Sequence, residues 1–255
     1  MIVITGASSG IGAALAREYA RDGAALALAG RDRARLDGLA AECRALGAAE
    51  VRIAALDVRD RAAMRGWLEE IAAGGPVEFV IANAGLLTGT PPDALVEPAD
   101  AAYRVMETNA LGVLNTVQPV LAGMLARGSG RIVLVASIAA FTPIADMPSY
   151  AASKAAILSY GLSLRAALAP HGVHVSVVCP GFIDTAMTDQ ISGDKPFMIS
   201  AEDAARRIRR GIARNRAVIA FPFLFAAMTR ICGLLPDPLR RWSARNYRLT
   251  VAPRE

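Results

Sequence analysis

Two side chains with complementary acid–base chemistry, Tyr150 and Lys154, stand four residues apart in the chain. They fall in a helical pattern over residues 150–169, and positions i and i+4 of a helix share one face. A free phenol has a pKa of about 10, too high for efficient proton exchange at neutral pH, and a nearby ammonium lowers it. The pair therefore predicts a general acid–base site on Tyr150, although an exposed Tyr–Lys pair is the ordinary interpretation of this spacing alone.

Two further polar residues, Ser137 and Asn109, argue against that ordinary interpretation. Ser137 directly follows a strand-like apolar run, residues 131–136. Its hydroxyl could hydrogen-bond a substrate oxygen and stabilise charge developing there, or act only as a turn or capping group. Asn109 lies inside a long helical pattern, residues 99–127, where asparagine is a poor helix former. The alternative interpretation of Asn109 is a solvated residue on the surface of that helix.

A glycine-rich segment near the start of the chain could hold a pyrophosphate. It reads Thr5-Gly6-Ala7-Ser8-Ser9-Gly10-Ile11-Gly12 and joins a strand-like run to a helical one, which is the context that makes such a triplet informative. Glycine permits the tight turn, the close approach of backbone to phosphate and the packing of helix on strand, and the helix N-terminus favours an anion. The predicted contacts are Gly6, Ser8, Ser9, Gly10, Ile11 and Gly12.

The next strand-like run ends in Gly30-Arg31-Asp32, where a dinucleotide site must recognise the adenosine ribose. A carboxylate suits a free 2′-hydroxyl, whereas the forked guanidinium of Arg31 suits a 2′-phosphate. Asp32 could contact the ribose, but a role as the N-cap of the following helix fits its position better. We therefore expect NADP(H) as the favoured cofactor, with NAD(H) possible.

The elements that must position these residues alternate along the chain. Strand-like apolar runs cover residues 2–5, 25–29, 51–56, 79–82, 131–136, 173–178 and 217–221, and helical patterns cover residues 10–21, 33–46, 61–72, 99–127, 150–169 and 201–213. Continuous apolar strands between helices predict an α/β doubly wound parallel sheet of about seven strands with helices on both faces, the Rossmann fold. One domain over residues 1–255 is expected, with a basic, apolar-rich C-terminal extension at 217–255.

Composition excludes several other classes. The 255 residues are 54% hydrophobic and 20% charged, which is typical of a globular protein, and no apolar run has the length of a membrane span. Cys43, Cys179 and Cys232 have neither metal-ligand nor disulfide-framework spacing. His171 and His174 lie far from the motifs and are expected to be structural. With no signal-peptide pattern at the start, these features predict a cytoplasmic protein without a metal site.

The net charge of +5 is concentrated near the C-terminus, where residues 201–255 hold twelve arginines and four acidic residues. The apolar part of residues 217–248 is interrupted by Pro222, Arg230, Gly233 and Pro236, so it would span a bilayer poorly. The main interpretation is a packed final helix with an exposed basic face. Closure of the substrate pocket, a subunit interface and weak, salt-sensitive contact with an anionic membrane stay open; no nucleic-acid partner is expected.

Taken together and in this order, the motifs resemble those of the short-chain dehydrogenase/reductase family, in its single-domain NAD(P)(H)-dependent branch. The resemblance covers roughly residues 1–220 and departs at Ala82, often Asn in the family, and near Ala167, often an acid. It depends on Thr5-Gly6-x-x-x-Gly10-x-Gly12, Asp57-Val58, Asn83-Ala84-Gly85, Asn109, Ser137, Tyr150-x-x-x-Lys154 and Pro180-Gly181.

The resemblance implies a role for each motif. Ser137 would hold the substrate oxygen, Tyr150 would transfer the proton, and Lys154 would tune Tyr150 and contact the nicotinamide ribose. Asn109 would kink its helix and hold a water in a proton relay. Cofactor contacts are further implied for Asp57 and Val58 at the adenine, Asn83, Ala84 and Gly85 at the adenosine ribose, and Pro180, Gly181, Ile183 and Thr185 at the nicotinamide. Helices over residues 111–125 and 150–168 would pair between copies in a homodimer or homotetramer.

The predicted function is hydride transfer between NADP(H) and a small-molecule carbonyl or alcohol. Loops at 86–98, 138–148 and 182–200 are expected to line the substrate pocket and are mostly apolar, which favours a lipophilic substrate. Their apolar members are Leu86, Leu87, Ile138, Phe141, Ile144, Met147, Met187, Phe197 and Met198. The alternatives are a non-catalytic nucleotide-binding regulator on the same fold, and an isomerase or dehydratase using the same tyrosine.

Overall fold

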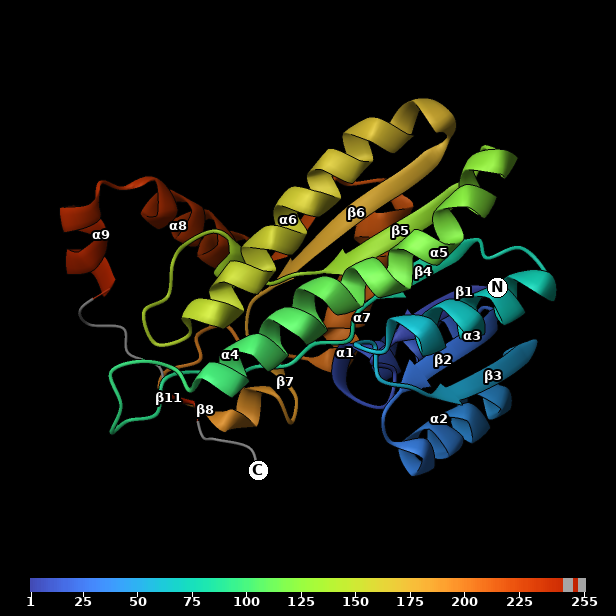
Figure 1. The fold of residues 1–255 in the computed structure, drawn as a ribbon, viewed down its shortest axis with the longest axis horizontal. Coiled ribbons are helices and arrows are strands. Elements are labelled where there is room, and N and C mark those ends of the chain that lie inside the picture. The colour runs from blue at the N-terminus through green and yellow to red at the C-terminus, as the bar shows by residue number, and fades with distance from the viewer. Residues whose placement is uncertain (245–249, 252–255) are drawn as a thin grey trace.

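The centre of the molecule is a seven-stranded sheet in which all neighbouring strands are parallel. The structure is a computed structural model, and it describes residues 1–244 and 250–251 (Figure 1). The strand order is β10-β6-β5-β4-β1-β2-β3, which confirms the predicted doubly wound sheet. The strands are β1 (Ile2–Thr5), β2 (Ala25–Gly30), β3 (Glu50–Ala55), β4 (Phe79–Ala82), β5 (Gly130–Val135), β6 (Val173–Pro180) and β10 (Val218–Phe221).

Helices cover both faces of this sheet, as predicted. One face packs against α1 (Gly10–Ala20), α2 (Arg33–Ala45) and α7 (Ala201–Ala213), and the other against α3 (Arg61–Ala73), α5 (Gly112–Arg127) and α6 (Pro148–Leu168). Consecutive residues of a strand point to opposite faces of the sheet, so the two faces have separate hydrophobic cores. Ile4 lies in the core under α1, α2 and α7, Val3 lies in the core under α3, α5 and α6, and both are fully buried. Burial on both faces explains why the strands are apolar without alternation.

The helical pattern predicted over residues 99–127 is not one continuous α-helix. It divides into α4 (Ala99–Met106), a π-helical turn (Glu107–Leu111) and α5. A π turn holds an extra residue, which changes the direction of the side chains that follow. Asn109 lies in this turn and is 1% exposed, so its alternative as a solvated residue is wrong.

The segment after β6, expected to form a loop at 182–200, contains short strand pairings. Strand β7 (Ile183–Asp184) pairs with β9 (Ile199–Ser200), and β8 (Ile191–Ser192) pairs antiparallel with β11 (Thr250–Val251). Helices α8 (Phe223–Leu234) and α9 (Asp237–Ala244) lie between β10 and β11 in the sequence. The 3₁₀ turns are Ile138–Ala140, Ala169–His171 and Thr188–Gln190. Within the described ranges, no helix is both long and apolar enough to cross a bilayer.

Candidate active site

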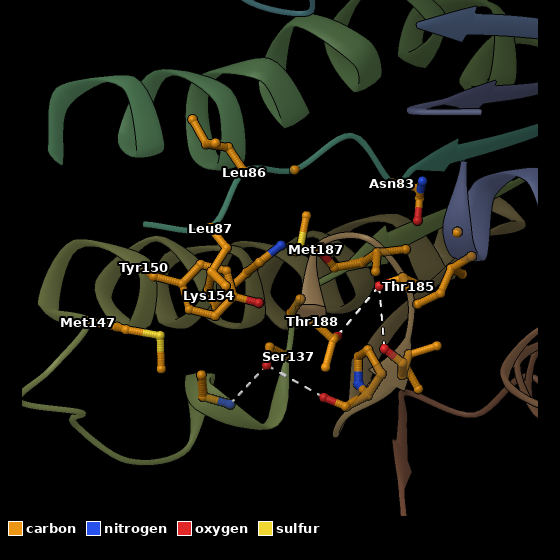
Figure 2. Close-up of a pocket in the computed structure, with 18 of the residues that line it drawn as sticks. Asn83, Leu86, Leu87, Ser137, Met147, Tyr150, Lys154, Thr185, Met187 and Thr188 are labelled. Carbon is orange, nitrogen blue, oxygen red and sulfur yellow. Dashed lines mark hydrogen bonds between the residues drawn. The ribbon is translucent and has the colours of Figure 1, made fainter. Parts of the chain in front are cut away.

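The carboxyl ends of the strands open into a cavity of about 950 Å³. Its walls include the glycine loop after β1, the ends of β2 to β6, and two residues of α6, Tyr150 and Lys154. Strands β1 and β4 are neighbours in the sheet, and the chain reverses its winding direction between them. A cavity at such a switch point is where open α/β sheets bind their ligands. Figure 2 shows Ser137, Tyr150 and Lys154 beside this cavity, with Met187, Thr185 and Thr188 nearby.

The glycine loop has a shape that only glycine permits. Gly6 and Gly10 have φ values of +64° and +54°, a region that disfavours a side chain. A Cβ on Gly6 would lie 2.7 Å from the Cα of Ala84, and one on Gly12 would collide with the carbonyl of Gly6. Gly12 does not belong to the cavity lining, so its observed contribution is the close packing of α1 that the sequence predicted.

Asn83, at the end of β4, fixes this loop from the side. Its amide nitrogen donates to the carbonyls of Thr5 and Gly6, each at 3.1 Å. Its backbone N–H donates to the Thr5 hydroxyl at 3.2 Å. Asn83, Ala84 and Gly85 all line the cavity, but the Asn83 amide group is occupied with the loop itself.

The N-terminus of α1 suits an anion. Ser9 is the N-cap residue in extended conformation; its hydroxyl makes no cap hydrogen bond in the described structure, and the first turn holds no acidic residue. The helix dipole and the first N–H groups therefore face the cavity without a competing negative charge. Thr185 stands opposite, since a Cβ on Gly10 would lie 3.1 Å from its methyl group. Both residues line the cavity, so Thr185 borders this end of α1.

At the end of β2, Asp32 and Arg31 have different surroundings. Asp32 caps α2, accepting from the Arg35 backbone N–H at 3.0 Å, and pairs with the Arg35 guanidinium at 3.1 Å. The predicted N-cap role of Asp32 is thus confirmed. Arg31 and Arg35 both line the cavity, so this end presents two guanidinium groups beside a carboxylate that already has partners.

Asp57 follows β3 and also lines the cavity, together with Val58. Both carboxylate oxygens of Asp57 accept from the guanidinium of Arg59, at 2.8–3.1 Å. The hydrogen bonds from Arg59 hold the pKa of Asp57 below its usual value. Asp57 therefore remains a carboxylate, able to accept but not to donate.

Ser137 stands at the end of β5 with its side chain in two hydrogen bonds. The hydroxyl accepts from the Ala139 N–H at 3.1 Å and donates to the Pro180 carbonyl at 3.5 Å. It thus caps the short 3₁₀ turn (Ile138–Ala140) and also lines the cavity. The two interpretations of Ser137 left open by the sequence are compatible.

Lys154 is buried, with 5% of its surface exposed. Its ammonium donates to the Val135 carbonyl at 3.0 Å and lies 5.6 Å from the centre of the Tyr150 ring. Burial lowers the pKa of Lys154 to about 8, and the electrostatic interaction with Cys179 opposes this. A substantial neutral fraction of this lysine therefore exists just above neutral pH.

The pKa of Tyr150 differs from the sequence expectation. Burial raises it above the ordinary value, opposed by the interaction with the Ser137 hydroxyl. The expectation that Lys154 lowers the Tyr150 pKa is thus wrong: burial raises this pKa, and the group that opposes the rise is Ser137. The physical reason is that the same burial disfavours the charged forms of both the phenol and the ammonium.

Asn109 lies behind the cavity wall. Its amide oxygen accepts from the Leu86 N–H at 2.7 Å, and its nitrogen donates to the Leu86 carbonyl at 2.9 Å and to the Ser153 hydroxyl at 3.1 Å. A Cβ on Gly85 would lie 3.4 Å from the Lys154 nitrogen and 3.5 Å from the Asn109 oxygen. The π turn therefore holds Asn109 next to the lysine and fixes the backbone that follows Gly85.

The remaining cavity wall is mostly apolar. The predicted lining residues Leu86, Leu87, Ile138, Ile144, Met147 and Met187 are present, as are the predicted cofactor neighbours Ser8, Ile11, Pro180, Gly181 and Ile183. Phe141, Phe197 and Met198 are not in the lining: Phe141 packs under the Arg230 guanidinium, and Phe197 and Met198 are 55% and 48% exposed. The positive φ of Phe197, 59°, indicates a tight turn there, which the sequence pattern does not reveal.

Helix α8 completes the wall with residues that sequence reasoning partly missed. Phe225, Met228, Thr229 and Cys232 of α8 line the cavity, and so does Arg240 of α9, in the C-terminal segment for which closure of the pocket was one alternative. Glu97 was also missed: its carboxylate accepts from the Ser149 N–H at 3.0 Å and so holds the first turn of α6, one residue before Tyr150. No local sequence motif indicates this contact, because 52 residues separate Glu97 from Ser149.

Comparisons with known proteins agree with this geometry. A family model described as short chain dehydrogenase matches residues 1–196. A Myxococcus xanthus protein described as an uncharacterized oxidoreductase is 36% identical over 250 residues, 96% of each chain. The solved short-chain dehydrogenase from Sphingobium yanoikuyae in complex with NADPH has a TM-score of 0.81 and 29% identity over 97% of this chain and 96% of that one. One from Mycobacterium paratuberculosis bound to NAD has a TM-score of 0.76 and 25% identity, over 86% and 94%.

Proposed function

Because the chain belongs to the short-chain dehydrogenase/reductase family, an NAD(P)-dependent oxidoreductase family, we propose that it reduces a lipophilic ketone or aldehyde with NADPH, with Tyr150 as proton donor. One observation carries the proposal. The cavity that contains the glycine loop is also lined by Ser137, Tyr150 and Lys154. A nucleotide and a carbonyl compound would thus meet in one space, at the side chains suited to proton transfer.

The cavity offers a group for each part of the nucleotide. The pyrophosphate would bind at the N-terminus of α1, through Gly6, Ser8, Ser9, Gly10 and Ile11. Asp57 and Val58 would contact the adenine, Asn83, Ala84 and Gly85 its ribose, and Pro180, Gly181, Ile183 and Thr185 the nicotinamide. When bound, the nicotinamide supplies or accepts the hydride.

Preference for the phosphorylated nucleotide is supported by the end of β2. Arg31, Asp32 and Arg35 all line the cavity there, and the Asp32 carboxylate caps α2 and pairs with Arg35. A guanidinium can hold a 2′-phosphate through two hydrogen bonds. One solved relative carries NADPH and another NAD, so within such proteins the choice depends on local groups of this kind.

The four predicted catalytic residues, Asn109, Ser137, Tyr150 and Lys154, would have distinct roles in the reaction. The Ser137 hydroxyl would turn from the Pro180 carbonyl to donate to the carbonyl oxygen of the substrate. The Tyr150 hydroxyl would deliver a proton to that oxygen as it becomes an alcohol. Lys154 is anchored by the Val135 carbonyl beside the Tyr150 ring, where it would return a proton to the tyrosine. Asn109 would keep the backbone at Leu86 in position through both of its amide bonds.

The character of the walls supports a lipophilic substrate. Leu87, Met147, Met187, Phe225 and Met228 line the same cavity as Tyr150, and the first three pack in one apolar cluster with it. Apolar walls with a few polar groups at one end orient a substrate by its carbonyl and desolvate the rest.

The test is a panel of ketones and aldehydes followed by loss of NADPH absorbance. Tyr150→Phe should lower the turnover of the best substrate by at least about a hundredfold, the size expected for a general acid, while NADPH affinity is retained. Tyr160→Phe is the matched control, since it removes the same hydroxyl elsewhere on α6, where the group contacts Gln118. Near-normal turnover by Tyr150→Phe would contradict the assignment.

A further inference from the structure

Helix α8 presents one face to the cavity and another to the outside. Phe225, Met228, Thr229 and Cys232 line the cavity. Near the end of the helix, Gly233 allows close packing, because a Cβ there would collide with the Phe141 carbonyl. The helix is thus a fixed part of the cavity wall.

The outward face of α8 is apolar. Phe223, Leu224, Ile231 and Leu234 are 81%, 61%, 62% and 87% exposed, and Leu239 of α9 is 53% exposed. Leu224, Ile231 and Leu234 recur at helical spacing and so form one stripe. The interpretation of this segment as a packed helix with an exposed basic face is therefore wrong for α8. Figure 1 shows α8 and α9 projecting from one end of the molecule.

The segment that carries this apolar stripe is basic in sequence. Residues 223–250 contain five arginines and one acidic residue, Asp237, a formal net charge of +4, and of these arginines the structure describes the side chains of Arg230 and Arg240. Arg230 lies within α8, with its guanidinium 4.2 Å from the centre of the Phe141 ring, and Arg240 of α9 pairs with Asp237 at 2.7 Å. Apolar side chains next to arginines are the combination that binds an anionic bilayer surface.

We propose that the outward face of α8 docks on the surface of an anionic lipid bilayer, with Leu224, Ile231 and Leu234 in the interfacial region. Charge favours a bilayer over a second copy of the chain. Two copies related by a twofold axis would bring α8 against α8, and so two segments of the same net charge, +4, toward each other. Protruding side chains also need no complementary pocket in fluid lipid, whereas a protein partner must supply one.

The docking goes beyond the proposed reaction, because it requires neither nucleotide nor turnover. It has a consequence for the cavity. Since the inner face of α8 forms part of the cavity wall, docking places that wall directly above the lipid. An apolar compound dissolved in the bilayer would then be concentrated beside the cavity.

The test is co-sedimentation of the full chain with vesicles of phosphatidylcholine and phosphatidylglycerol, compared with phosphatidylcholine alone, at low and high salt. We expect binding to the anionic vesicles that weakens as salt screens the arginines. The double variant Leu224→Gln/Ile231→Gln should lower the partition coefficient by at least about tenfold, because it removes apolar surface available for insertion. Leu95→Gln/Val96→Gln is the matched control, since these side chains are 99% and 73% exposed on a different loop, and it should bind as the wild type.

Reduction of a water-soluble ketone and light scattering are measured on the same proteins. Leu224 and Ile231 are not in the cavity lining, so turnover should persist in the double variant and shows that it is folded. The proposal is overturned if the wild type does not sediment with anionic vesicles at low salt, or if the double variant binds them equally well. It is also overturned if light scattering shows that the wild type is an oligomer and the double variant is not, while the wild type does not bind vesicles, since α8 is then a subunit interface.

Discussion

Replacing Lys154 by methionine should make the nucleotide-free protein more stable near neutral pH. The lysine is 5% exposed, and burial lowers its pKa from 10.5 to about 8. The unfolded lysine keeps its proton up to about pH 10.5, so between these two values the unfolded chain binds more protons than the folded one. The wild-type free energy of unfolding therefore rises with pH across this window, and the penalty for burying the ammonium is fully present below it.

The size of the effect follows from the two pKa values. A fall from 10.5 to about 8 corresponds to about 3 kcal/mol, at about 1.4 kcal/mol per pH unit. Methionine has a similar length and no charge, but it removes the donor to the Val135 carbonyl, a loss of about 1 kcal/mol. Lys154→Met should thus gain about 2 kcal/mol near neutral pH and lose about 1 kcal/mol well above pH 10.5, where the folded and unfolded lysine are both largely neutral.

The assay is urea unfolding of both proteins, without nucleotide, across this pH range. Lys195→Met, which changes the other lysine of the chain, controls for the loss of a lysine elsewhere. A variant that is less stable than the wild type near neutral pH, or a difference that does not change with pH, would refute the reasoning. Turnover by Lys154→Met should be low at every pH, so the same substitution separates stability from activity.

Three other results are expected. Arg31→Ala should weaken NADPH binding by about 1.5–3 kcal/mol, the value of a charged hydrogen bond, and NADH much less, with Arg33→Ala as a neighbouring control; equal weakening of both nucleotides would exclude Arg31 from phosphate recognition. Val251→Asp places a charge in the apolar cluster of Leu87, Met147 and Ile191. It should raise the KM for the substrate by at least about tenfold at unchanged NADPH affinity, because an unpaired charge is unstable in an apolar cluster and disrupts that wall of the pocket. Val251→Thr should behave nearly as the wild type, and an unchanged KM in Val251→Asp would show that β11 does not shape the pocket. Light scattering should report a dimer or tetramer, since Tyr103 and Leu111 beside α5 are 71% and 53% exposed; a monomer at micromolar concentration would contradict this.

Most of the sheet and its order of elements could be predicted from the sequence. Apolar runs such as residues 2–5 are buried on both faces, and such runs are typical of parallel strands between helices. The glycine loop was predictable for a related reason. A positive φ and a near contact with Ala84 leave no room for another residue at Gly6, so the backbone geometry is visible in the residue type.

Features that depend on partners distant in sequence were not predictable. The π turn around Asn109 is stabilised by Leu86 and Ser153, and neither contact changes the helical pattern of residues 99–127. The pairing of β8 with β11 involves two residues on each side, too few to produce a period.

The pKa shifts of Tyr150 and Lys154 and the apolar character of both faces of α8 could not be predicted for another reason. The effect of Lys154 on Tyr150 depends on how deeply each side chain is buried, which residue types alone do not give. Similarly, α8 is apolar on both its inner and its outer face, so the hydrophobic pattern could not indicate which side lines the cavity.

The two hydrogen bonds from Asn83 to the glycine loop bear on the speed and strength of nucleotide binding. A fluctuating loop loses conformational entropy each time a ligand orders it, about 1–2 kcal/mol for each residue fixed. Here the loop is tied to the end of β4 through the carbonyls of Thr5 and Gly6, so it is already ordered when the sheet folds. Binding affinity is then not reduced by an ordering step. Free and bound loops should share one conformation, and association should be limited by diffusion into the cavity rather than by rearrangement of the phosphate site.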